Sequence, residues 1–301
     1  MNASKLLTMT SFFDFSESAV AELASLDAAR ALQEDVGAGD LTAGLIDPAR
    51  RARAHVLARE AAVICGIPWA QAALQQVDPE VRLTWRVQEG QHCALDQVVL
   101  EMEGSARALL TAERTALNFL QLLSAVATKT ASYVDAVQSV PGNRAQIVDT
   151  RKTLPGLRLA QKYAVRTGGG TNHRIGLYDA VLIKENHIAA AGGVTAVLAR
   201  AALVAPSAKF IEIEVETIAQ LKEALNAGAT MVLLDNMDLG QLREAVQLNA
   251  GRAILEVSGG VNMSTVRDIA ATGVDRISIG ALTKDVQATD FSMRFIADLT
   301  A

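Results

Sequence analysis

The sequence has little of what marks secreted, membrane-bound or nucleic-acid-binding proteins. Of its 301 residues only Cys65 and Cys93 are cysteines, too few for a disulfide framework and not spaced as zinc ligands. A net charge of −5 argues against a general nucleic-acid binder. No apolar run approaches membrane-spanning length, and the N-terminus lacks the basic-then-apolar order of a signal peptide. These absences predict a cytoplasmic protein with no nucleic-acid or membrane partner.

Hydrophobic residues are abundant, at 50% of the chain, so a large core can be buried. The first part of the sequence predicts a small α+β domain over residues 1–124, with the tail 286–301 packing back on it. Apolar periodicity and glycine punctuation give its expected elements: a helix at 17–34, strands within 53–64 and 81–102, and a helix at 69–76. A longer apolar-periodic stretch, 106–140, predicts one or two helices leading out of this domain.

From residue 145 onward, strands alternate with helices. The expected strands are 145–149, 180–184, 210–216, 231–235, 253–258 and 276–280. The expected helices are 157–166, 194–203, 218–226, 239–248 and 264–271. Such alternation implies parallel strands joined by right-handed crossovers. It predicts an open TIM-like α/β barrel over residues 125–285, with a doubly wound sheet as the alternative.

Polar or glycine residues at the C-terminal ends of these strands favour the barrel. They are Asp149, Lys184, Glu214 or Glu216, Asp235, Ser258 and Gly280. In TIM-like barrels this rim carries the active site, whereas a doubly wound sheet concentrates such residues at one switch point. On the last two strands, Ser258-Gly259-Gly260 and Ser278-Ile279-Gly280 predict a phosphate cup, although a plain tight turn explains each alone.

A basic island lies between Arg144 and Lys184. This segment holds eight lysines and arginines but only two acidic residues, Asp149 and Asp179, within an acidic protein. Such a local reversal of charge predicts an anionic ligand.

The strand at 210–216 alternates glutamate with β-branched residues. Period two places Glu212, Glu214 and Glu216 on one face, which in a barrel projects into the lumen. Buried carboxylates there need cationic neighbours. The alternative is an edge strand with a solvated face. In the barrel, Glu214 and Asp235 are expected to hold Mg²⁺ or sugar hydroxyls.

Several long segments resemble one enzyme family. They are LQEDVGAGDLT, LLTAERTALNFLQLLSAVAT, DTRKTLPGLRLAQKYAV, GGGTNHRIGLYDAVLIKENHI, EIEVE, LLDNM, LEVSGGV and SIGALT. Together they are similar to quinolinate phosphoribosyltransferase, the carboxylating nicotinate-nucleotide pyrophosphorylase. The resemblance implies an N-terminal α/β sandwich, an open seven-stranded barrel and a homodimer in which one subunit's N-terminal domain covers the other's barrel mouth. Only six strands follow from the pattern, so the seventh is either missed or merged into the loop at residues 171–179.

The resemblance also implies an activity: transfer of the phosphoribosyl group of PRPP to quinolinate with decarboxylation. The products are nicotinate mononucleotide, diphosphate and CO₂, in de novo NAD biosynthesis. Mg²⁺ is the expected cofactor, and no organic cofactor is expected. Two other functions stay open. One is a related phosphoribosyltransferase acting on another acid, such as nicotinate; the other is a non-catalytic phosphosugar sensor.

By motif, the resemblance assigns a role to each site residue. The residues implied to bind quinolinate are Arg151, His173, Arg174 and Lys184. Lys152 is implied to face the PRPP pyrophosphate, and Arg114 to come from the partner subunit. Glu214 and Asp235 stabilise the positive charge that develops on the ribose, while Lys184 either protonates the decarboxylated carbon or binds carboxylate. A hydrogen-bonding role stays open for His173 and a surface ion pair for Arg114. Arg158, Lys162 and Arg166, four residues apart, are expected on a solvated or supporting helix face.

Overall fold

The computed structural model describes residues 14–296, so the ends of the predicted N-terminal domain and of the C-terminal tail, 1–13 and 297–301, lie outside the described residues. The described chain forms two compact units. We call them the antiparallel-sheet unit, which comprises residues up to Lys129 together with Pro155–Gly168 and the segment from Asp285, and the parallel-sheet unit, which comprises Thr130–Leu154 and Gly169–Lys284.

The antiparallel-sheet unit contains a four-stranded sheet in the order β12-β1-β5-β3. Its strands are β1 (Arg51–Ala58), β3 (Arg82–Trp85), β5 (Val98–Ser105) and β12 (Phe291–Phe295). Alternate residues of β1 are buried, as the period of a half-covered strand requires. The C-terminal strand β12 pairs with β1, with Ala54 opposite Phe295. A separate pair joins β2 (Ala62–Val63) and β4 (His92–Cys93).

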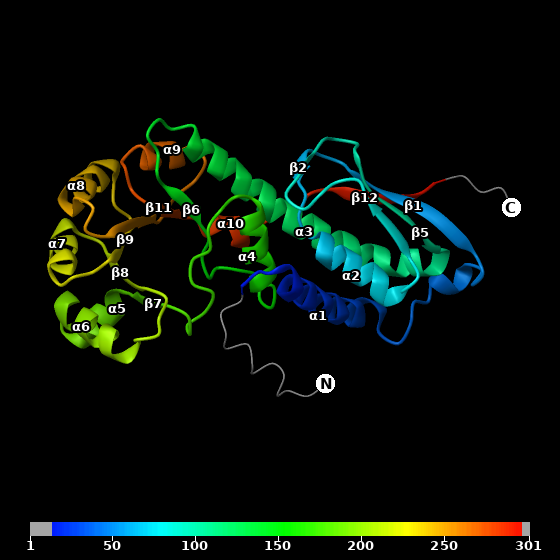
Figure 1. Ribbon diagram of the computed structural model, residues 1–301, viewed down its shortest axis with the longest axis horizontal. Helices are drawn as coiled ribbons and strands as arrows, with labels where there is room; N and C mark the ends of the chain where they lie inside the picture. Colours follow the sequence, from blue (N-terminus) through cyan, green and yellow to red (C-terminus); the bar gives the residue numbers. More distant parts are fainter. Residues whose placement is uncertain (1–13, 297–301) are drawn as a thin grey trace. The chain divides into compact units, whose positions relative to one another are not determined.

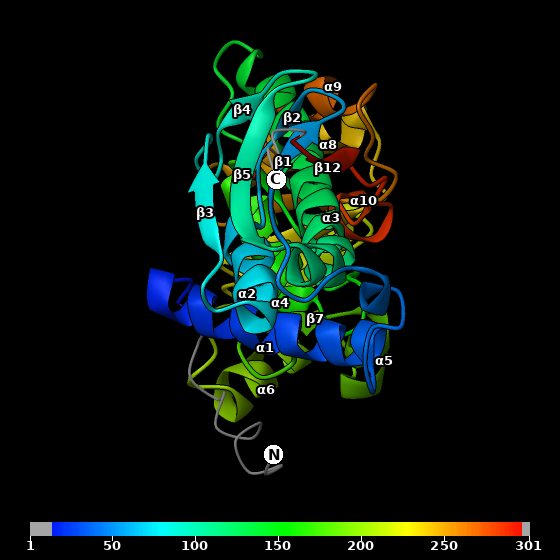
Figure 2. The same cartoon turned by 90° about the vertical axis from the view of Figure 1, so that its right-hand side faces the viewer.

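Helices form the second layer of this unit (Figure 2). They are α1 (Glu17–Val36), the 3₁₀ turn η2 (Ala43–Leu45), α2 (Ile67–Val77), α3 (Ala106–Gln138) and α4 (Arg158–Thr167). The expected helices at 17–34 and 69–76 are confirmed, and α3 is one continuous helix of 33 residues. Buried side chains of α2 and α3, such as Leu74 and Leu120, share one core with those of β1 and β5. The unit therefore has its own two-layer apolar core.

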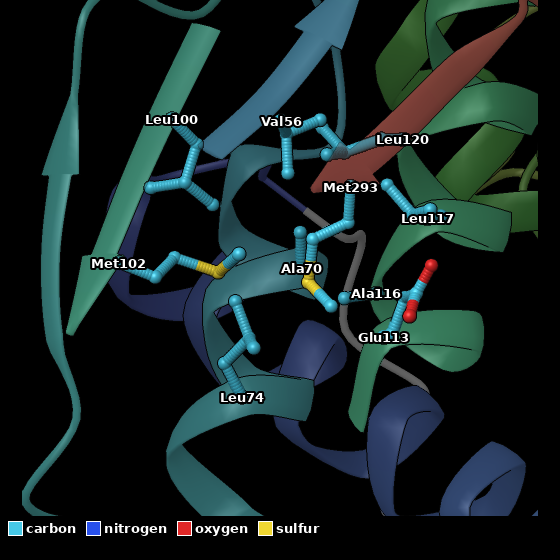
Figure 3. A pocket seen from close by; sticks show the side chains of 10 residues that line it. All are labelled: Val56, Ala70, Leu74, Leu100, Met102, Glu113, Ala116, Leu117, Leu120 and Met293. Carbon is cyan, nitrogen blue, oxygen red and sulfur yellow. The ribbon is translucent and has the colours of Figure 1, made fainter. Parts of the chain in front are cut away.

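A small hollow lies inside this core, between the sheet and α3 (Figure 3). Its lining is apolar, for example Val56, Leu100 and Met293, apart from the carboxylate of Glu113. Burial raises the pKa of Glu113, and the positive charge of Arg114 partly opposes that rise. With so few polar groups, the hollow is a packing feature of the core.

The parallel-sheet unit is a ring segment of six strands with helices outside them (Figure 1). The strand order is β6-β11-β10-β9-β8-β7, and every pairing is parallel. The strands are β6 (Gln146–Val148), β7 (Val181–Ile183), β8 (Ile211–Val215), β9 (Met231–Asp235), β10 (Ile254–Ser258) and β11 (Arg276–Ser278). All six strands predicted from the sequence are confirmed, with ends shifted by one or two residues.

No seventh strand is found among the described residues. Thr171 makes a single parallel bridge to Val148, on the side of β6 away from β11. Thr171 follows three glycines, Gly168, Gly169 and Gly170. In the loop after Thr171, the chain leaves the sheet and its backbone forms hydrogen bonds with side chains. The pairing that a seventh strand would make therefore consists of one residue pair. In the part of the chain that the structure describes, no strand pairing joins β6 to β7.

The helices of the parallel-sheet unit are α5 (Glu185–Ala191), α6 (Val194–Val204), α7 (Ile218–Asn226), α8 (Leu239–Asn249), α9 (Val266–Ala270) and α10 (Ala281–Lys284). The predictions for α6 to α9 are confirmed, whereas the short helices α5 and α10 were not predicted. Thr217 and Asp238 cap α7 and α8 by accepting from the backbone N–H of Gln220 and Gln241. Between residues 14 and 296 no single helix is long and apolar enough to cross a membrane, although α5 and α6, bent by 95°, meet the length and composition requirement together.

Helix α4 is confirmed, and its basic residues differ in exposure. Arg166 is exposed and lies 5.0 Å above the ring of Phe15. Lys162, by contrast, is fully buried, like Gln161, so of the two positions expected for this face the supporting one applies to it and the solvated one does not. Spacing by four places residues on one face of a helix but does not say how much of that face is covered.

Candidate active site

Four charged side chains lie at or beyond the C-terminal ends of parallel strands and act electrostatically on one another. We call Lys152, Lys184, Glu214 and Asp235 the rim set. Lys184 follows β7, and its Nζ lies 2.8 Å from Oε2 of Glu214 on the adjacent β8. Burial raises the pKa of Asp235 at the end of β9, the negative charge of Glu214 raises it further, and Lys184 and Lys152 oppose the rise. The rim set is therefore one electrostatic group, as the strand-end argument predicts.

Two predicted glycines permit close approaches beside the rim set. At Gly259, where φ is +99°, a Cβ atom would collide with the side chain of Asn236. A Cβ atom at Gly280 would lie 3.0 Å from Cδ of Lys152. Gly259 follows Ser258 at the end of β10, and Gly280 stands two residues beyond β11, so both flank adjacent strand ends. The backbone at these two positions can approach a ligand where a larger residue would block it.

Two guanidinium groups lie near each other in the loop region after β6. Burial lowers the pKa of Arg174, the positive charge of Arg151 lowers it further, and Asp179 and Glu212 oppose this. Asp179 fixes the loop by accepting hydrogen bonds of 2.9 Å from the backbone N–H groups of Ile175 and Gly176. Two neighbouring cations held in this way suit an anionic ligand with more than one acceptor.

His173 is held on three sides by hydrogen bonds. Its backbone N–H donates to Asp149 (2.9 Å), and its Nδ1 accepts from the backbone N–H of Arg174 (2.7 Å). Its Nε2 lies 2.8 Å from Oε2 of Glu212. With both ring nitrogens engaged inside the protein and 8% of the residue exposed, the geometry favours the hydrogen-bonding role that the sequence left open.

Beneath the rim lies a second charged group, which we call the interior cluster: His173, Glu212, Glu256 and Arg276. Glu212 and Glu256 have no exposed surface. Arg276 Nε lies 2.9 Å from Glu256 Oε2, an ion pair whose angle falls outside hydrogen-bond geometry. Burial is the main cause that raises the pKa of each glutamate to about 7.

Sequence reasoning missed Glu256 and Arg276 and did not assign Glu212 a role. Their signal is nevertheless visible, since Glu256 interrupts the apolar strand Ile254–Ser258 and Arg276 opens β11. Parallel strands covered on both faces are normally apolar throughout, so a charged residue within one calls for a partner. For Glu212 the expected cationic neighbour is present: Arg276 acts electrostatically on it and lowers its pKa against the effect of burial.

The parallel-sheet unit thus contains all predicted site residues except one. Arg114 is an exposed residue of α3 in the antiparallel-sheet unit, next to Glu113. Its predicted role in a neighbouring subunit stays a prediction.

An open α/β barrel with opposed charges and glycine-bearing strand ends at one rim is typical of barrel enzymes that bind phosphorylated substrates. The matches to family models agree with this class of enzyme and also identify the family. The N-terminal domain model of quinolinate phosphoribosyl transferase matches residues 40–124, and the C-terminal domain model matches residues 126–294. The chain belongs to the quinolinate phosphoribosyltransferase family.

Individual relatives are similar over nearly their whole length. The nicotinate-nucleotide pyrophosphorylase [carboxylating] of Mycobacterium leprae is 42% identical over 88% of this chain and 94% of that protein. The probable nicotinate-nucleotide pyrophosphorylase [carboxylating] of Bacillus subtilis is 38% identical over 86% and 89%. The solved structure of the nicotinate-nucleotide pyrophosphorylase from Francisella tularensis has a TM-score of 0.88 at 40% identity and covers 92% of this chain and 97% of that one.

Proposed function

We propose that this chain transfers the phosphoribosyl group of PRPP to quinolinate with decarboxylation, giving nicotinate mononucleotide, diphosphate and CO₂ in NAD biosynthesis. The observation that carries the proposal is the group of opposed charges at one barrel rim, in which the carboxylates Glu214 and Asp235 act electrostatically with Lys184 and Lys152. The reaction needs both kinds of charge, because its two substrates are anionic and its sugar becomes cationic.

Quinolinate carries two carboxylates, and the guanidinium groups of Arg151 and Arg174 supply matching donors. Arginine binds a carboxylate through two parallel N–H bonds, which fixes the orientation of the ring as well as its position. The neighbouring positive charge that lowers the pKa of Arg174 shows that both cations act on one region. A dianionic ligand placed there relieves their repulsion.

The diphosphate of PRPP is assigned to Lys152 and the backbone around Ser258, Gly259, Gly260 and Gly280. Lys152 is exposed, and its backbone carbonyl accepts from the Thr283 hydroxyl at 2.8 Å, which anchors the residue beside Gly280. Anchored main chain with an exposed ammonium is well suited to a multiply charged phosphate.

Glu214 and Asp235 are assigned to the ribose and to Mg²⁺. The two carboxylates fit a divalent cation, because the charge of Glu214 already raises the pKa of Asp235, a repulsion that a cation removes. The chemistry that a bound Mg²⁺ supplies is neutralisation of charge on diphosphate and ribose oxygens. As diphosphate leaves, the two carboxylates also stabilise the positive charge that develops on the sugar.

The later steps need no organic cofactor. The attacking pyridine nitrogen carries a free lone pair, so no general base is required. Once alkylated, this nitrogen carries a positive charge that stabilises the electron pair left on the adjacent carbon when CO₂ departs. Lys184, at 49% side-chain exposure and 2.8 Å from Glu214, is placed at the rim either to protonate the resulting carbanion or to bind carboxylate.

We also propose a homodimer in which Arg114 completes the partner's site. Its exposed position on α3 supports the proposal. An inactive Arg114→Ala enzyme mixed with an inactive Asp235→Ala enzyme should regain part of the activity, because one of the two sites in a mixed dimer keeps both residues. Mixtures that stay as inactive as the separate variants argue against sharing.

For the domains, we propose residues 125–285 as the catalytic barrel and 1–124 with 286–301 as the N-terminal domain. The pairing of β12 with β1 supports the second assignment. A cytoplasmic location is proposed from the two free, buried cysteines. Plant relatives carry the words mitochondrial or chloroplastic in their names, so the family occupies several compartments.

The activity is tested by incubating the enzyme with PRPP, Mg²⁺ and either quinolinate or nicotinate. We expect nicotinate mononucleotide and CO₂ from quinolinate and no product from nicotinate, because the paired arginines match two carboxylates. Product from nicotinate would indicate a related phosphoribosyltransferase. Binding of PRPP without any turnover would indicate a phosphosugar sensor.

A further inference from the structure

Helices α7 and α8 each begin, shortly after a barrel strand, with a reciprocal pair of side-chain contacts. The side chain at the N-cap accepts from the backbone N–H of the third helical residue, and the side chain of that residue accepts from the N-cap N–H. The pairs are Thr217 with Gln220, at 3.2 Å in both directions, and Asp238 with Gln241, at 2.9 Å in both. The two contacts satisfy backbone donors at the helix start and fix the entry of the chain into the helix.

Helix α5 uses this pattern in one direction. Its N-cap is Lys184, whose ammonium group has donors but no acceptor and so cannot receive a backbone N–H. At the third helical position, Nδ1 of His187 accepts from the Lys184 N–H at 3.0 Å. The N–H of His187 donates to the backbone carbonyl of Lys184 instead, at 2.8 Å. The junction between β7 and α5 therefore depends on the imidazole more than the other two junctions depend on their glutamines.

The lysine at this N-cap serves the rim and not the helix. Serine, threonine, aspartate and asparagine are the preferred N-cap residues, and lysine is not among them. The side chain of Lys184 instead reaches across to β8, where its Nζ lies 2.8 Å from Oε2 of Glu214. The chain has thus placed a functional cation where a capping residue would otherwise stand, and His187 supplies the acceptor that holds its backbone.

The position of the Lys184 backbone matters because its side chain is long and poorly covered. That side chain is 49% exposed, against 14% for its partner Glu214. Packing therefore restricts the ammonium group little, and its reach is defined by the backbone from which it starts. A catalytic group displaced by about 1 Å can lose much of its effect.

We propose that His187 is a positioning residue for Lys184: its imidazole holds the Lys184 backbone at the end of β7 so that the ammonium group stays beside Glu214 and the substrate. The proposal rests on the function proposed above. His187 acts through Lys184 and needs no contact with the substrate. The property required at position 187 is an acceptor for the N–H of residue 184, which glutamine provides at the same place in α7 and α8.

The kinetic test is a double-mutant cycle. His187→Ala removes one hydrogen-bond acceptor and should lower kcat/KM for quinolinate by roughly threefold to tenfold. In the Lys184→Ala background the same change should have an effect of less than about twofold, because the group that it positions is gone. An equal loss in both backgrounds, or no loss in His187→Ala alone, would overturn the proposal.

Two further variants separate the contact from the residue type. His187→Gln supplies an acceptor without an imidazole and should restore kcat/KM to within about twofold of the wild type. Gln241→Ala is the matched control, since it removes the same contact from α8, where Asp238 keeps its own cap, and it should change kcat/KM by less than about twofold. If His187→Gln is as impaired as His187→Ala, or the control loses as much activity, the positioning role is wrong.

Hydrogen exchange at the Lys184 amide tests the contact without any measurement of activity. This amide should exchange slowly in the wild type, about tenfold faster in His187→Ala, and slowly again in His187→Gln. Fast exchange in the wild type would overturn the proposal even if no variant folds. If exchange behaves as expected but the wild-type enzyme forms no nicotinate mononucleotide, it is the proposed function that fails, so the two failures are distinguished.

Discussion

Glu212 and Glu214 stand two residues apart on β8 and project from the same face, yet their surroundings are opposite. Glu214 belongs to the rim set, is partly exposed and contacts a half-exposed lysine. Glu212 belongs to the interior cluster, is fully buried and contacts a histidine and a second carboxylate. The strand rises by only about 7 Å between them. Over that distance the role of the carboxylate changes: Glu214 is assigned to the substrate, whereas Glu212 supports neighbouring residues of the protein.

The difference shows what depth along a barrel strand does to a carboxylate. At the rim, solvent screens charge and a lysine can exchange one partner for another during a reaction. In the interior, each charge must be balanced within the fold, because desolvation costs more than a single ion pair returns. Removal of a charge should therefore affect catalysis at the rim and stability in the interior.

The largest expected effect is on stability. Arg276→Ala leaves two buried carboxylates without their cation and should lower the free energy of unfolding by about 3–5 kcal/mol. Lys184→Ala, the matched rim variant, should change it by less than about 1 kcal/mol because its ion pair is half-exposed. Urea denaturation measures both. Equal losses would remove the distinction between interior and rim.

Next in size is the effect of Asp235→Ala on turnover. Loss of a carboxylate that stabilises the cationic sugar should lower kcat by about 100-fold to 1000-fold, while the unfolding free energy stays close to that of the wild type. Asp238→Ala, a helix-cap change three residues away, should lower stability by about 1 kcal/mol and leave kcat unchanged. Unchanged turnover and Mg²⁺ dependence in Asp235→Ala would refute the role assigned to Asp235.

A smaller effect is expected for Arg151→Ala. Loss of one charge-assisted carboxylate contact, about 1.5–3 kcal/mol, should raise the quinolinate KM by roughly 10-fold to 150-fold. The KM for PRPP should move far less. Steady-state kinetics with each substrate varied in turn measures this split. Normal quinolinate affinity in the variant would refute the assignment of Arg151.

The last effect is a slope with pH instead of a single loss, and it concerns the pH dependence of stability. The interior glutamates have a pKa raised from 4.5 to about 7 on folding, so the folded state binds more protons between these values. Their contribution is complete below about pH 4.5 and is lost as pH rises through about 7, at about 1 kcal/mol per pH unit for each proton. The double variant Glu212→Gln and Glu256→Gln should flatten this slope. Denaturant midpoints across the range measure it, and a slope of opposite sign would contradict the burial effect.

Much of the barrel could be predicted because its signals are local. Six strands followed from apolar runs and alternation, and the position of Lys184 and Glu214 at one rim followed from the rule that parallel strand ends meet at one edge, although their contact was not predicted. A need for cationic neighbours at Glu212 was also expected, because the two-residue period of its strand places it in the barrel lumen. The identity of these cations could not be predicted, because Arg276 is distant in the sequence and its position depends on the registers of β8 to β11.

Other misses have similar causes. Lys162 shares helical spacing with the half-buried Arg158 and the exposed Arg166, and only tertiary packing buries it fully. The seventh strand was inferred from a resemblance. In the structure, Thr171 makes only a single bridge, and the chain beside it forms the hydrogen bonds of a loop instead of those of a strand. Helix α5 is too short for a periodic signal.

The strand β12 gives the molecule an order of assembly. Its partner β1 begins at Arg51, whereas β12 ends at Phe295, so the edge of the first sheet is supplied by a segment synthesised long after β1. Until β12 has been synthesised, β1 presents an unpaired backbone edge with Ala54 and Val56 on it. A nascent chain in this state can pair with a neighbouring nascent chain. Completion of the first domain thus waits for a strand that follows the whole parallel-sheet unit in the sequence.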